Sequence, residues 1–390
     1  MKHVLLIGIE GVYNYGCEAI VRGTVEILRN YNSKIDITYA SYNYDYDRNR
    51  LSDLNINIVQ RYRSKKKWTI KNIRNKLLSI LNILPNKFDN TNFVKDYDII
   101  FSIGGDMYTL SQNGSFYYAL PVFIEKCLKK NPKMKYVLWG ASVGPFTGNR
   151  KAEEFYKKHL RKADLIVARE AATIEYLKTI GINSNVVFGP DPAFFVPSES
   201  QKVSRDNNDK LLLGINLSPL SSLYKYGSIE KGIEIQSRAI ESLIKNINAN
   251  IVLIPHVLAY NNSDDDLSYL RSIKDNISRD LQPYVSIIEE DEGFIGRKKI
   301  LSQLDCVIAA RMHCAINAIS CGVPTILLSY SAKAKGMAEF VYGDHSMICG
   351  LELFENIGEI IKMINNRRSP EIAVSIDAFN YNALLETIVR

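Results

Sequence analysis

This chain of 390 residues has no CxxC pair and no membrane-length apolar run. Its six cysteines are scattered, which argues against a zinc ribbon or a disulfide framework and favours thiols in a reducing compartment. No apolar stretch approaches the roughly 20 residues that span a bilayer. The N-terminal MKHVLLIGIEG has an apolar run too short for a signal peptide, and we interpret it as a first strand. We therefore expect a cytoplasmic protein.

Signatures for common cofactors and for nucleic acid are also missing. The glycines of GIEGVYNYGCEAI do not have the GxGxxG spacing, so a dinucleotide site has weak support. No RNP-type motif points to nucleic acid, and no cluster of potential ligands suggests a metal. We expect neither a metal nor a bound cofactor.

Size and charge narrow the possibilities. The length exceeds the roughly 100–200 residues of one domain, so two domains are expected. Apolar residues make up 46% of the chain, enough for real cores, and the net charge is +7. A moderately basic protein suits anionic partners such as phosphorylated substrates, nucleic acid or a membrane surface.

Short apolar runs alternate with helical patterns along the chain, which is typical of α/β proteins with parallel sheets. Strands are predicted at 3–9, 35–40, 97–103, 135–140, 164–168, 185–188, 210–215, 250–254, 284–288, 305–309 and 325–329. Helices are predicted between them, for example at 17–30, 151–162, 170–180, 231–247 and 265–279. We expect two Rossmann-like parallel-sheet domains that face a cleft, a GT-B-like arrangement.

Domain boundaries follow from composition. The polar segment 197–209 is predicted to link an N-terminal domain (1–200) to a C-terminal domain (209–370). A final helical segment, 371–390, could pack on either domain, including back on the first.

The segment 61–84 is basic at its start and apolar at helical spacing later, with Trp68 at the edge. Such a helix can lie on an anionic membrane, which would make the protein peripheral at the inner face of the cytoplasmic membrane. A helix docked on its own domain is an equally good interpretation.

Polar or glycine-rich residues follow nearly every predicted strand, where open α/β sheets bind their ligands. Acids predominate in the first half and bases in the second, which favours a cleft enzyme. The candidates are Asn14, Glu18, Gly104, Gly105, Asp106, Ser142, Arg169, Asn216, Ser218, His256, Arg311, His313, Lys333 and Lys335.

Residues 305–324, DCVIAARMHCAINAISCGVP, carry the strongest signal. Arg311 and His313 stand where an apolar strand opens into a helix N-terminus, whose N–H groups attract anions. Arginine can clamp a carboxylate or phosphate, and histidine can exchange a proton near neutral pH. A capping loop with a surface arginine and a packed histidine fits the same residues equally well.

The other candidates have structural alternatives. Glu18 can stabilise its own helix dipole, and Asp106 can cap the next helix instead of accepting a sugar proton. His256 can be a satisfied structural histidine. Lys333 and Lys335, in the small-residue loop SYSAKAKG, can be merely solvated.

Taken in order, these motifs resemble the polysaccharide pyruvyl transferase family over most of the chain. The matching elements are GxxNxGCEAI around 11–20, IGGD (103–106), SVGPF (142–146), ARE with Thr173, DPAF (191–194), RMHCAINAISCGVP (311–324) and YSAKAKG (330–336). The resemblance implies a GT-B-like fold and a role in cell-surface polysaccharide synthesis. It also implies transfer of pyruvate from phosphoenolpyruvate to two hydroxyls of a sugar, which gives a cyclic ketal and phosphate.

That chemistry assigns roles to the candidates. His313 is the expected acid that protonates C3 of phosphoenolpyruvate, and Arg311 holds a donor anion with Lys333 or Lys335. Asp106 or Glu18 orients the sugar and takes a hydroxyl proton. The main alternative is a GT-B glycosyltransferase that uses a nucleotide sugar, and a silent carbohydrate- or lipid-carrier-binding scaffold is a third. The basic segment suggests a lipid-linked acceptor.

Overall fold

A computed structural model describes residues 2–61, 73–74, 77, 92–111, 113–197, 210–259, 264–329, 332–371 and 379–389. The chain divides into two compact units. Unit 1 comprises Met1–Val12, Ile20–Pro192 and Ser375–Arg390, and unit 2 comprises Tyr13–Ala19 and Ala193–Val374. The division at Pro192 precedes the predicted linker, of which 198–209 lie outside the described residues.

Unit 1 contains a seven-stranded parallel sheet in the order β3-β2-β1-β4-β5-β6-β7. Its strands are β1 (His3–Ile7), β2 (Asp36–Ser41), β3 (Asn57–Gln60), β4 (Ile99–Ile103), β5 (Lys135–Ala141), β6 (Leu165–Ala168) and β7 (Val186–Phe188). Its helices are α1 (Tyr15–Tyr31), which begins in unit 2, α2 (Tyr44–Arg50), α4 (Ala119–Lys130), α5 (Arg150–Leu160), α6 (Ala171–Thr179) and α14 (Tyr381–Val389).

Unit 2 contains a six-stranded parallel sheet in the order β10-β9-β8-β11-β12-β13. Its strands are β8 (Leu211–Asn216), β9 (Ala249–Leu253), β10 (Val285–Ile287), β11 (Cys306–Ala309), β12 (Thr325–Ser329) and β13 (Ile348–Gly350). Its helices are α7 (Pro219–Tyr226), α8 (Ile229–Ile247), α9 (Asp266–Asp275), α10 (Gly293–Leu301), α11 (Met312–Ile319), α12 (Ala332–Tyr342) and α13 (Ile357–Asn365). Short 3-10 turns lie at Ser52–Leu54, Asn92–Asp96, Pro192–Phe195, Gln282–Tyr284 and Leu351–Glu355.

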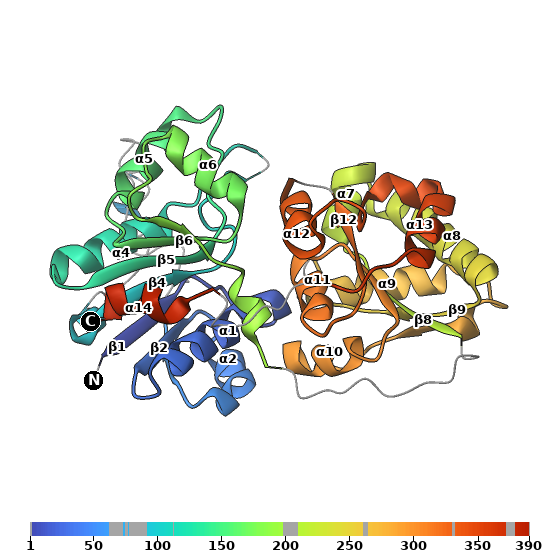
Figure 1. Cartoon of the computed structure of the whole chain (residues 1–390), viewed down its shortest axis with the longest axis horizontal. Helices are drawn as coiled ribbons and strands as arrows, with labels where there is room; N and C mark the ends of the chain where they lie inside the picture. The colour runs from blue at the N-terminus through green and yellow to red at the C-terminus, as the bar shows by residue number, and fades with distance from the viewer. Residues whose placement is uncertain are drawn as a thin grey trace. The chain divides into compact units, whose positions relative to one another are not determined.

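Both sheets confirm the predicted parallel α/β class, and Figure 1 shows helices packed around each of them. Two short edge strands, β3 and β13, were not predicted. The loop expected at 330–336 is also wrong in part, because Ala332 begins helix α12.

In each sheet the strand order reverses at one place, between β1 and β4 and between β8 and β11. Such switch points, at the carboxyl ends of the strands, are where doubly wound sheets bind ligands. At the switch point of unit 1, the chain that leaves β1 lies directly against the end of β4. A Cβ on Gly8, whose φ is +136°, would lie 2.1 Å from the Ile103 carbonyl oxygen. Only glycine allows the chain to leave β1 so close to β4.

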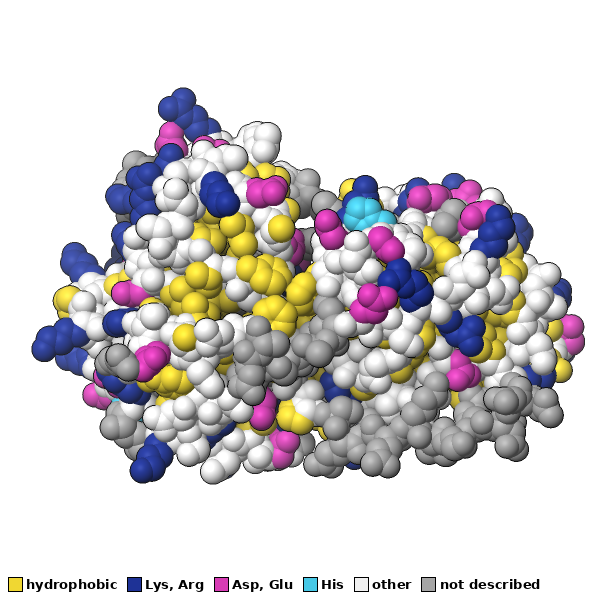
Figure 2. All heavy atoms as spheres, viewed as in Figure 1, with side chains coloured by type: hydrophobic (Ala, Val, Ile, Leu, Met, Phe, Trp, Pro, Cys, Tyr) yellow, Lys and Arg dark blue, Asp and Glu magenta, His cyan; other side chains and the backbone are white. Residues whose placement is uncertain are grey.

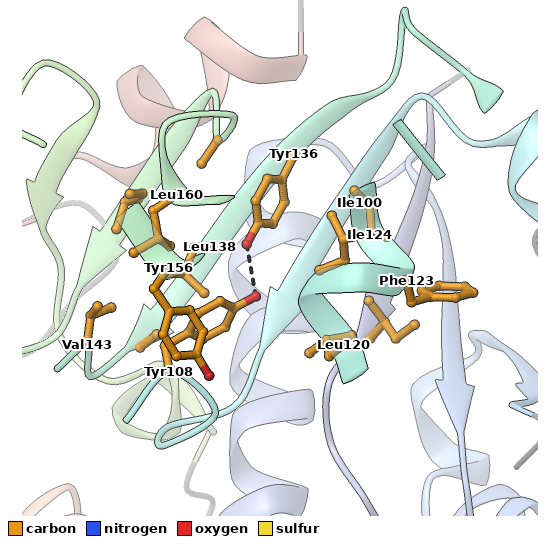
Figure 3. Close-up of a cluster of buried hydrophobic side chains, with 14 of the residues drawn as sticks. Ile100, Tyr108, Leu120, Phe123, Ile124, Tyr136, Leu138, Val143, Tyr156 and Leu160 are labelled. Carbon is orange, nitrogen blue, oxygen red and sulfur yellow. Dashed lines mark hydrogen bonds between the residues drawn. The ribbon is translucent and has the colours of Figure 1, made fainter. Parts of the chain in front are cut away.

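The core of unit 1 lies between β4, β5 and helices α4 and α5 (Figure 3). It buries apolar side chains such as Leu138 and Phe123 together with three tyrosines, Tyr108, Tyr136 and Tyr156. The Tyr108 and Tyr136 hydroxyls lie 2.9 Å apart, and Tyr136 also contacts His159 Nε2 at 3.0 Å. These polar groups are therefore paired with one another inside the core, as buried polar groups must be.

The end of the chain packs against unit 1. Helix α14, red in Figure 1, places the Tyr381 ring 5.4 Å from the Trp139 ring. The Tyr381 hydroxyl donates a hydrogen bond to the Pro190 carbonyl at 3.1 Å. A Cβ on Gly189 would lie 2.9 Å from the same hydroxyl, so the chain after β7 and Tyr381 are fitted to each other.

Candidate active site

Arg169, which follows β6, organises the carboxyl ends of four strands of unit 1. Its guanidinium donates hydrogen bonds to Asp191 Oδ2 at 2.7 Å and to Asp106 Oδ1 at 3.1 Å. Its Nε donates to Ser142 Oγ at 3.1 Å, and Glu170 Oε1 lies 3.5 Å away. Burial lowers the pKa of Arg169, but the neighbouring carboxylates outweigh burial and hold that pKa above its usual value. Arg169 therefore stays charged.

The surroundings of Arg169 include three more predicted site residues. A Cβ on Gly105 would lie 2.6 Å from both Nη1 and Nη2 of Arg169, so only glycine leaves room for the guanidinium. The Ser142 hydroxyl donates to Glu170, and the Ser142 N–H donates to the Gly105 carbonyl at 2.8 Å. Gly104 precedes this turn with φ +121°. The structure thus brings Gly104, Gly105, Ser142 and Arg169 together.

Asp106 is the exposed member of this cluster. Its side chain is 60% exposed, whereas that of Asp191 is 1% exposed. Arg169 fixes one Asp106 oxygen, and the exposure leaves the carboxylate able to reach a ligand. This arrangement suits a base that meets a sugar hydroxyl.

Arg311 follows β11 in unit 2 and is held by two aspartates. Its Nη2 lies 2.6 Å from Asp264 Oδ1 and 2.8 Å from Asp266 Oδ1. Burial lowers the pKa of Arg311, but Asp266 and Asp264 outweigh burial and raise that pKa above its usual value. The sequence suggested an open clamp for a donor anion, whereas the structure shows a guanidinium already neutralised by carboxylates.

The polar side-chain atoms of Asn216 and Ser218 also form hydrogen bonds within unit 2. The Asn216 side chain accepts from the Arg311 N–H at 2.8 Å and donates to the Ile254 carbonyl at 2.8 Å. Ser218 caps helix α7 by accepting from the Ser221 N–H at 3.2 Å. Both side chains are fully buried. Asn216 supports the Arg311 turn and Ser218 starts a helix, so each has a structural role, and their contact with substrate stays a prediction.

Four basic side chains gather near the ends of β9 and β11: His256, Arg297, Arg311 and His313. Burial, followed by the charges of His313, Arg297 and Arg311, lowers the pKa of His256 well below its usual value. His256 is therefore neutral at neutral pH, and its buried Nε2 has no hydrogen-bond partner within the described residues. His313, the second residue of helix α11, is partly exposed, although its Nε2 is buried.

Arg297 on helix α10 was not selected from the sequence. It is fully buried and donates only to carbonyl oxygens, those of Pro255 at 3.1 Å, Glu290 at 2.7 Å and Ile288 at 3.5 Å. Its Nη1 has no partner in the part of the chain that the structure describes. No sequence signal marked it, because RKK in a helix normally indicates a solvated face.

The N-terminal turn belongs to the same unit. Asn14 Oδ1 accepts from the Gly16 N–H at 3.0 Å, so its side chain holds the turn. Glu18 is 1% exposed and accepts from the Phe294 N–H at 2.9 Å. Glu18 lies in the first turn of its own helix α1, but its carboxylate binds the start of a second helix, α10, which the sequence did not predict.

The two lysines lie on helix α12. Lys335 is exposed, and the Lys333 side chain lies outside the described residues. Within the described ranges, no group of three or more His, Cys, Asp or Glu side chains could hold a metal ion. No helix in those ranges is long and apolar enough to cross a membrane.

On the face shown in Figure 2, Lys and Arg side chains gather along the left side, over helices α4 and α5. The exposed basic residues of α4, α5 and the turn after α5 include Lys126, Lys129, Lys130, Arg150, Lys151, Lys158, Arg161 and Lys162. Most of the predicted basic segment 61–84 lies outside the described residues, although Ile73 and Leu77 are exposed.

Solved structures with the same fold are sugar-nucleotide enzymes. The UDP-GlcNAc 2-epimerase of Neisseria meningitidis matches with a TM-score of 0.61 and 16% identity, covering 100% of both chains. The Methanocaldococcus jannaschii UDP-GlcNAc 2-epimerase matches with a TM-score of 0.60 and 13% identity, covering 100% of this chain and 99% of that one. At such identities the likeness defines the fold alone: a GT-B-like protein of two parallel-sheet α/β domains.

Sequence comparison identifies the family. The family model for polysaccharide pyruvyl transferase matches residues 14–332, and the chain belongs to that family. The amylovoran biosynthesis protein AmsJ of Erwinia amylovora is 22% identical over 360 residues, which cover 86% of this chain and 85% of AmsJ. The protein is therefore a pyruvyl transferase of polysaccharide synthesis.

Proposed function

We propose that the enzyme transfers pyruvate from phosphoenolpyruvate to two hydroxyls of one sugar, which forms a cyclic ketal and releases phosphate. The observation that carries this proposal is the placement of His313 and the buried Arg297 close to His256, near the strand ends of unit 2. A donor with one carboxylate and one phosphate needs positive charge and a proton source at the same place. Family membership supplies the pyruvyl group as the unit transferred.

His313 is the proposed acid of this reaction. Protonation of C3 of the donor makes C2 electrophilic, and an imidazole can deliver that proton near neutral pH. His256 is ruled out for this role by the burial that keeps it neutral. His313 is the partly exposed imidazole of the cluster, at the start of a helix.

The donor anions bind, in this proposal, at the first turn of helix α11. The N–H groups at a helix N-terminus attract anions. Arg297 adds a buried positive charge that has only carbonyl acceptors, and Lys335 adds an exposed one. Arg311 contributes by fixing the turn to Asp264 and Asp266. Positive charge also stabilises the departing phosphate.

The acceptor sugar binds at the strand ends of unit 1, with Asp106 as the base. One hydroxyl adds to C2 while its proton passes to Asp106, and the bond between C2 and the phosphate oxygen then breaks. The second hydroxyl adds to C2 and closes the ketal. Of the two hydroxyl protons, one balances the proton placed on C3 and the other leaves with phosphate.

The test combines product analysis with one matched substitution. Candidate acceptors are incubated with phosphoenolpyruvate and examined by mass spectrometry for one added pyruvyl unit, while released phosphate is measured. His313→Ala should lose about 100-fold or more in phosphate release, as expected for the loss of a general acid. His345→Ala, at an exposed histidine, should retain full activity. Full phosphate release by His313→Ala would show that the acid is misassigned.

The donor class is tested separately by thermal shift. A ligand that binds only the folded protein raises the unfolding midpoint, by about 2.7 kcal/mol of stability at a hundred times its Kd. We expect phosphoenolpyruvate to raise the midpoint and UDP-sugars to leave it unchanged. The opposite result would favour a nucleotide-sugar glycosyltransferase, and binding without turnover would favour a silent scaffold.

We also propose that the acceptor is a lipid-linked precursor of a capsule or exopolysaccharide, met at the inner face of the cytoplasmic membrane. The basic segment 61–84 and the exposed basic side chains over α4 and α5 support this location. Anionic lipid headgroups attract such clusters.

A further inference from the structure

The turn from Asn14 to Glu18 is attached to unit 2 by its backbone. The Tyr15 N–H donates to the His256 carbonyl at 3.2 Å, and the Leu258 N–H donates to the Tyr13 carbonyl at 3.3 Å. Asn14 and Val257 form an antiparallel bridge. The turn is therefore an added edge of the segment that follows β9, the segment that also carries His256.

Gly16 lies directly against the His313 ring. A Cβ at position 16 would lie 2.4 Å from His313 Nδ1, 2.5 Å from Cγ and 2.8 Å from Cβ. Real Cβ atoms essentially never approach other heavy atoms so closely, so any side chain at position 16 must displace the imidazole. Because Asn14 also holds the Gly16 N–H, the backbone is fixed where the ring meets it.

A second connection runs through helix α10 to the helix that carries His313. Glu18 accepts from the Phe294 N–H at 2.9 Å, and Asn317 on helix α11 donates to the Phe294 carbonyl at 3.3 Å. The Tyr15 hydroxyl donates to Asp291 at 2.6 Å, just before helix α10. Phe294 also contacts the His256 ring edge-on, at a centroid distance of 5.9 Å.

We propose that residues 14–18 are a positioning element for His313, and that Glu18 is a helix anchor and not the base that takes the acceptor proton. Gly16 sets the position of the imidazole, and Glu18 sets the position of helix α11 through Phe294 and Asn317. This inference rests on the proposed role of His313 as the acid. It leaves Asp106 as the carboxylate that meets the acceptor.

The first test replaces Gly16 by alanine, with Gly358→Ala as the control. Gly358 is an exposed helical glycine whose added Cβ would meet nothing closer than 3.6 Å. Gly16→Ala should lower kcat about 100-fold, the loss expected when a reacting group moves by about 1 Å. The KM for phosphoenolpyruvate should change less, and Gly358→Ala should change neither.

Ring position is measured without substrate. The five histidines give five Cε1–Hε1 signals in a carbon-labelled sample, and His313→Gln assigns one of them. Gly16→Ala should move the His313 signal, whereas Gly358→Ala should leave it in place. An unmoved His313 signal in Gly16→Ala overturns the inference, whatever the donor proves to be. Absence of phosphate release from the wild-type protein would overturn only the proposed function.

A double variant covers the case in which Gly16→Ala folds poorly. If the steric contact is with the imidazole, Gly16→Ala should lower the melting temperature strongly in the wild type and only slightly in a His313→Ala background. An equal loss in both backgrounds contradicts the contact.

Glu18 is tested by two substitutions. Glu18→Gln keeps an oxygen that accepts from the Phe294 N–H but cannot act as a base, whereas Glu18→Ala removes both properties. We expect Glu18→Gln to keep kcat within about threefold of the wild-type value and to leave the pH profile unchanged. Glu18→Ala should lower kcat and should also move the His313 signal. A Gln variant as inactive as the Ala variant, with its His313 signal in place, would identify Glu18 as the base and overturn the inference.

Discussion

Removing the Arg169 guanidinium should destabilise unit 1, mainly because it leaves the buried carboxylate of Asp191 without its partner. Arg169 is paired with Asp191, Asp106 and Glu170, whose side chains are 1%, 60% and 16% exposed. In Arg169→Met, Asp106 can recover hydration from water, but Asp191 cannot. The loss of one partner from a buried ion pair costs about 3–5 kcal/mol. We expect a cost in this range, set mainly by Asp191.

The exposed pair Arg150–Glu154 provides a matched control. Its side chains are 91% and 66% exposed and are spaced i,i+4 on helix α5. Such surface pairs contribute about 0.3–0.5 kcal/mol, so Arg150→Met should be nearly neutral. Both substitutions remove one guanidinium from unit 1, which separates the effect of burial from that of net charge.

Urea unfolding with a local probe measures the difference. Trp139 is buried in unit 1, and Trp68→Phe removes the other of the two tryptophans, so fluorescence reports on unit 1 even if the units unfold separately. With an m-value of about 2 kcal/mol/M, Arg169→Met should lower the midpoint by about 1.5–2.5 M and Arg150→Met by about 0.2 M. Equal shifts would refute the assignment.

A double-mutant cycle adds an independent check. Asp191→Leu removes the buried carboxylate, so it should be costly alone and should recover part of the loss in the Arg169→Met background. Coupling of about 1–3 kcal/mol is expected for residues in one buried network. Simple additivity of the two costs would mean that the pair does not act as a unit.

Two further predictions concern acid stability and membrane binding. The hydrogen bond from His159 lowers the pKa of Glu125 to about 2, so its contribution to stability is complete at neutral pH and is lost as pH falls from its ordinary value of 4.5 towards 2. Burial lowers the pKa of His159, which adds a loss as pH falls through its ordinary value of 6.5. Glu125→Gln should therefore flatten the fall in melting temperature below about pH 4.5 but keep the part that begins near pH 6.5, and an unchanged profile would contradict the Glu125 contribution. Separately, reversal of the three lysines at 65–67 should weaken co-sedimentation with anionic vesicles by about 100-fold or more, at about 1 kcal/mol per lysine. Equal weakening when the exposed unit 2 residues Lys231, Lys245 and Arg279 are reversed instead would show a net-charge effect, and unchanged pelleting would reject membrane contact by 65–67.

The sequence predicted the long buried strands well because they are continuous apolar runs. It missed β3 and β13 because these edge strands have four and three residues, with alternating or partial burial. Helix α12 was taken for a loop because Ala, Lys and Gly dominate its start, although Ala and Lys are good helix formers. Short strands and helices are stabilised mainly by tertiary packing, which cannot be predicted from local composition.

The candidate site shows the same limit. The position of residues just after predicted strands correctly indicated some that lie together, such as Ser142 and Arg169. It could not show that Arg311 pairs with Asp264 and Asp266, which are 47 and 45 residues away in the chain. Arg297 was not selected from the sequence, and it is the packing of helix α10 that buries it. Partners that come from distant loops decide whether a motif arginine is available to a ligand.

The pairing of each arginine supports the proposed division of acceptor and donor between unit 1 and unit 2. In unit 1, three carboxylates surround one guanidinium, and Asp106 projects into solvent. Such an edge repels a donor that carries a carboxylate and a phosphate, but it suits a neutral sugar whose hydroxyl must lose a proton. In unit 2, Asp264 and Asp266 are already bound to Arg311, while Arg297 donates its hydrogen bonds to carbonyl oxygens and lies over the Tyr15 ring. These contacts therefore favour unit 2 as the place for the proposed anionic donor, because Arg297 is not already paired with a carboxylate there.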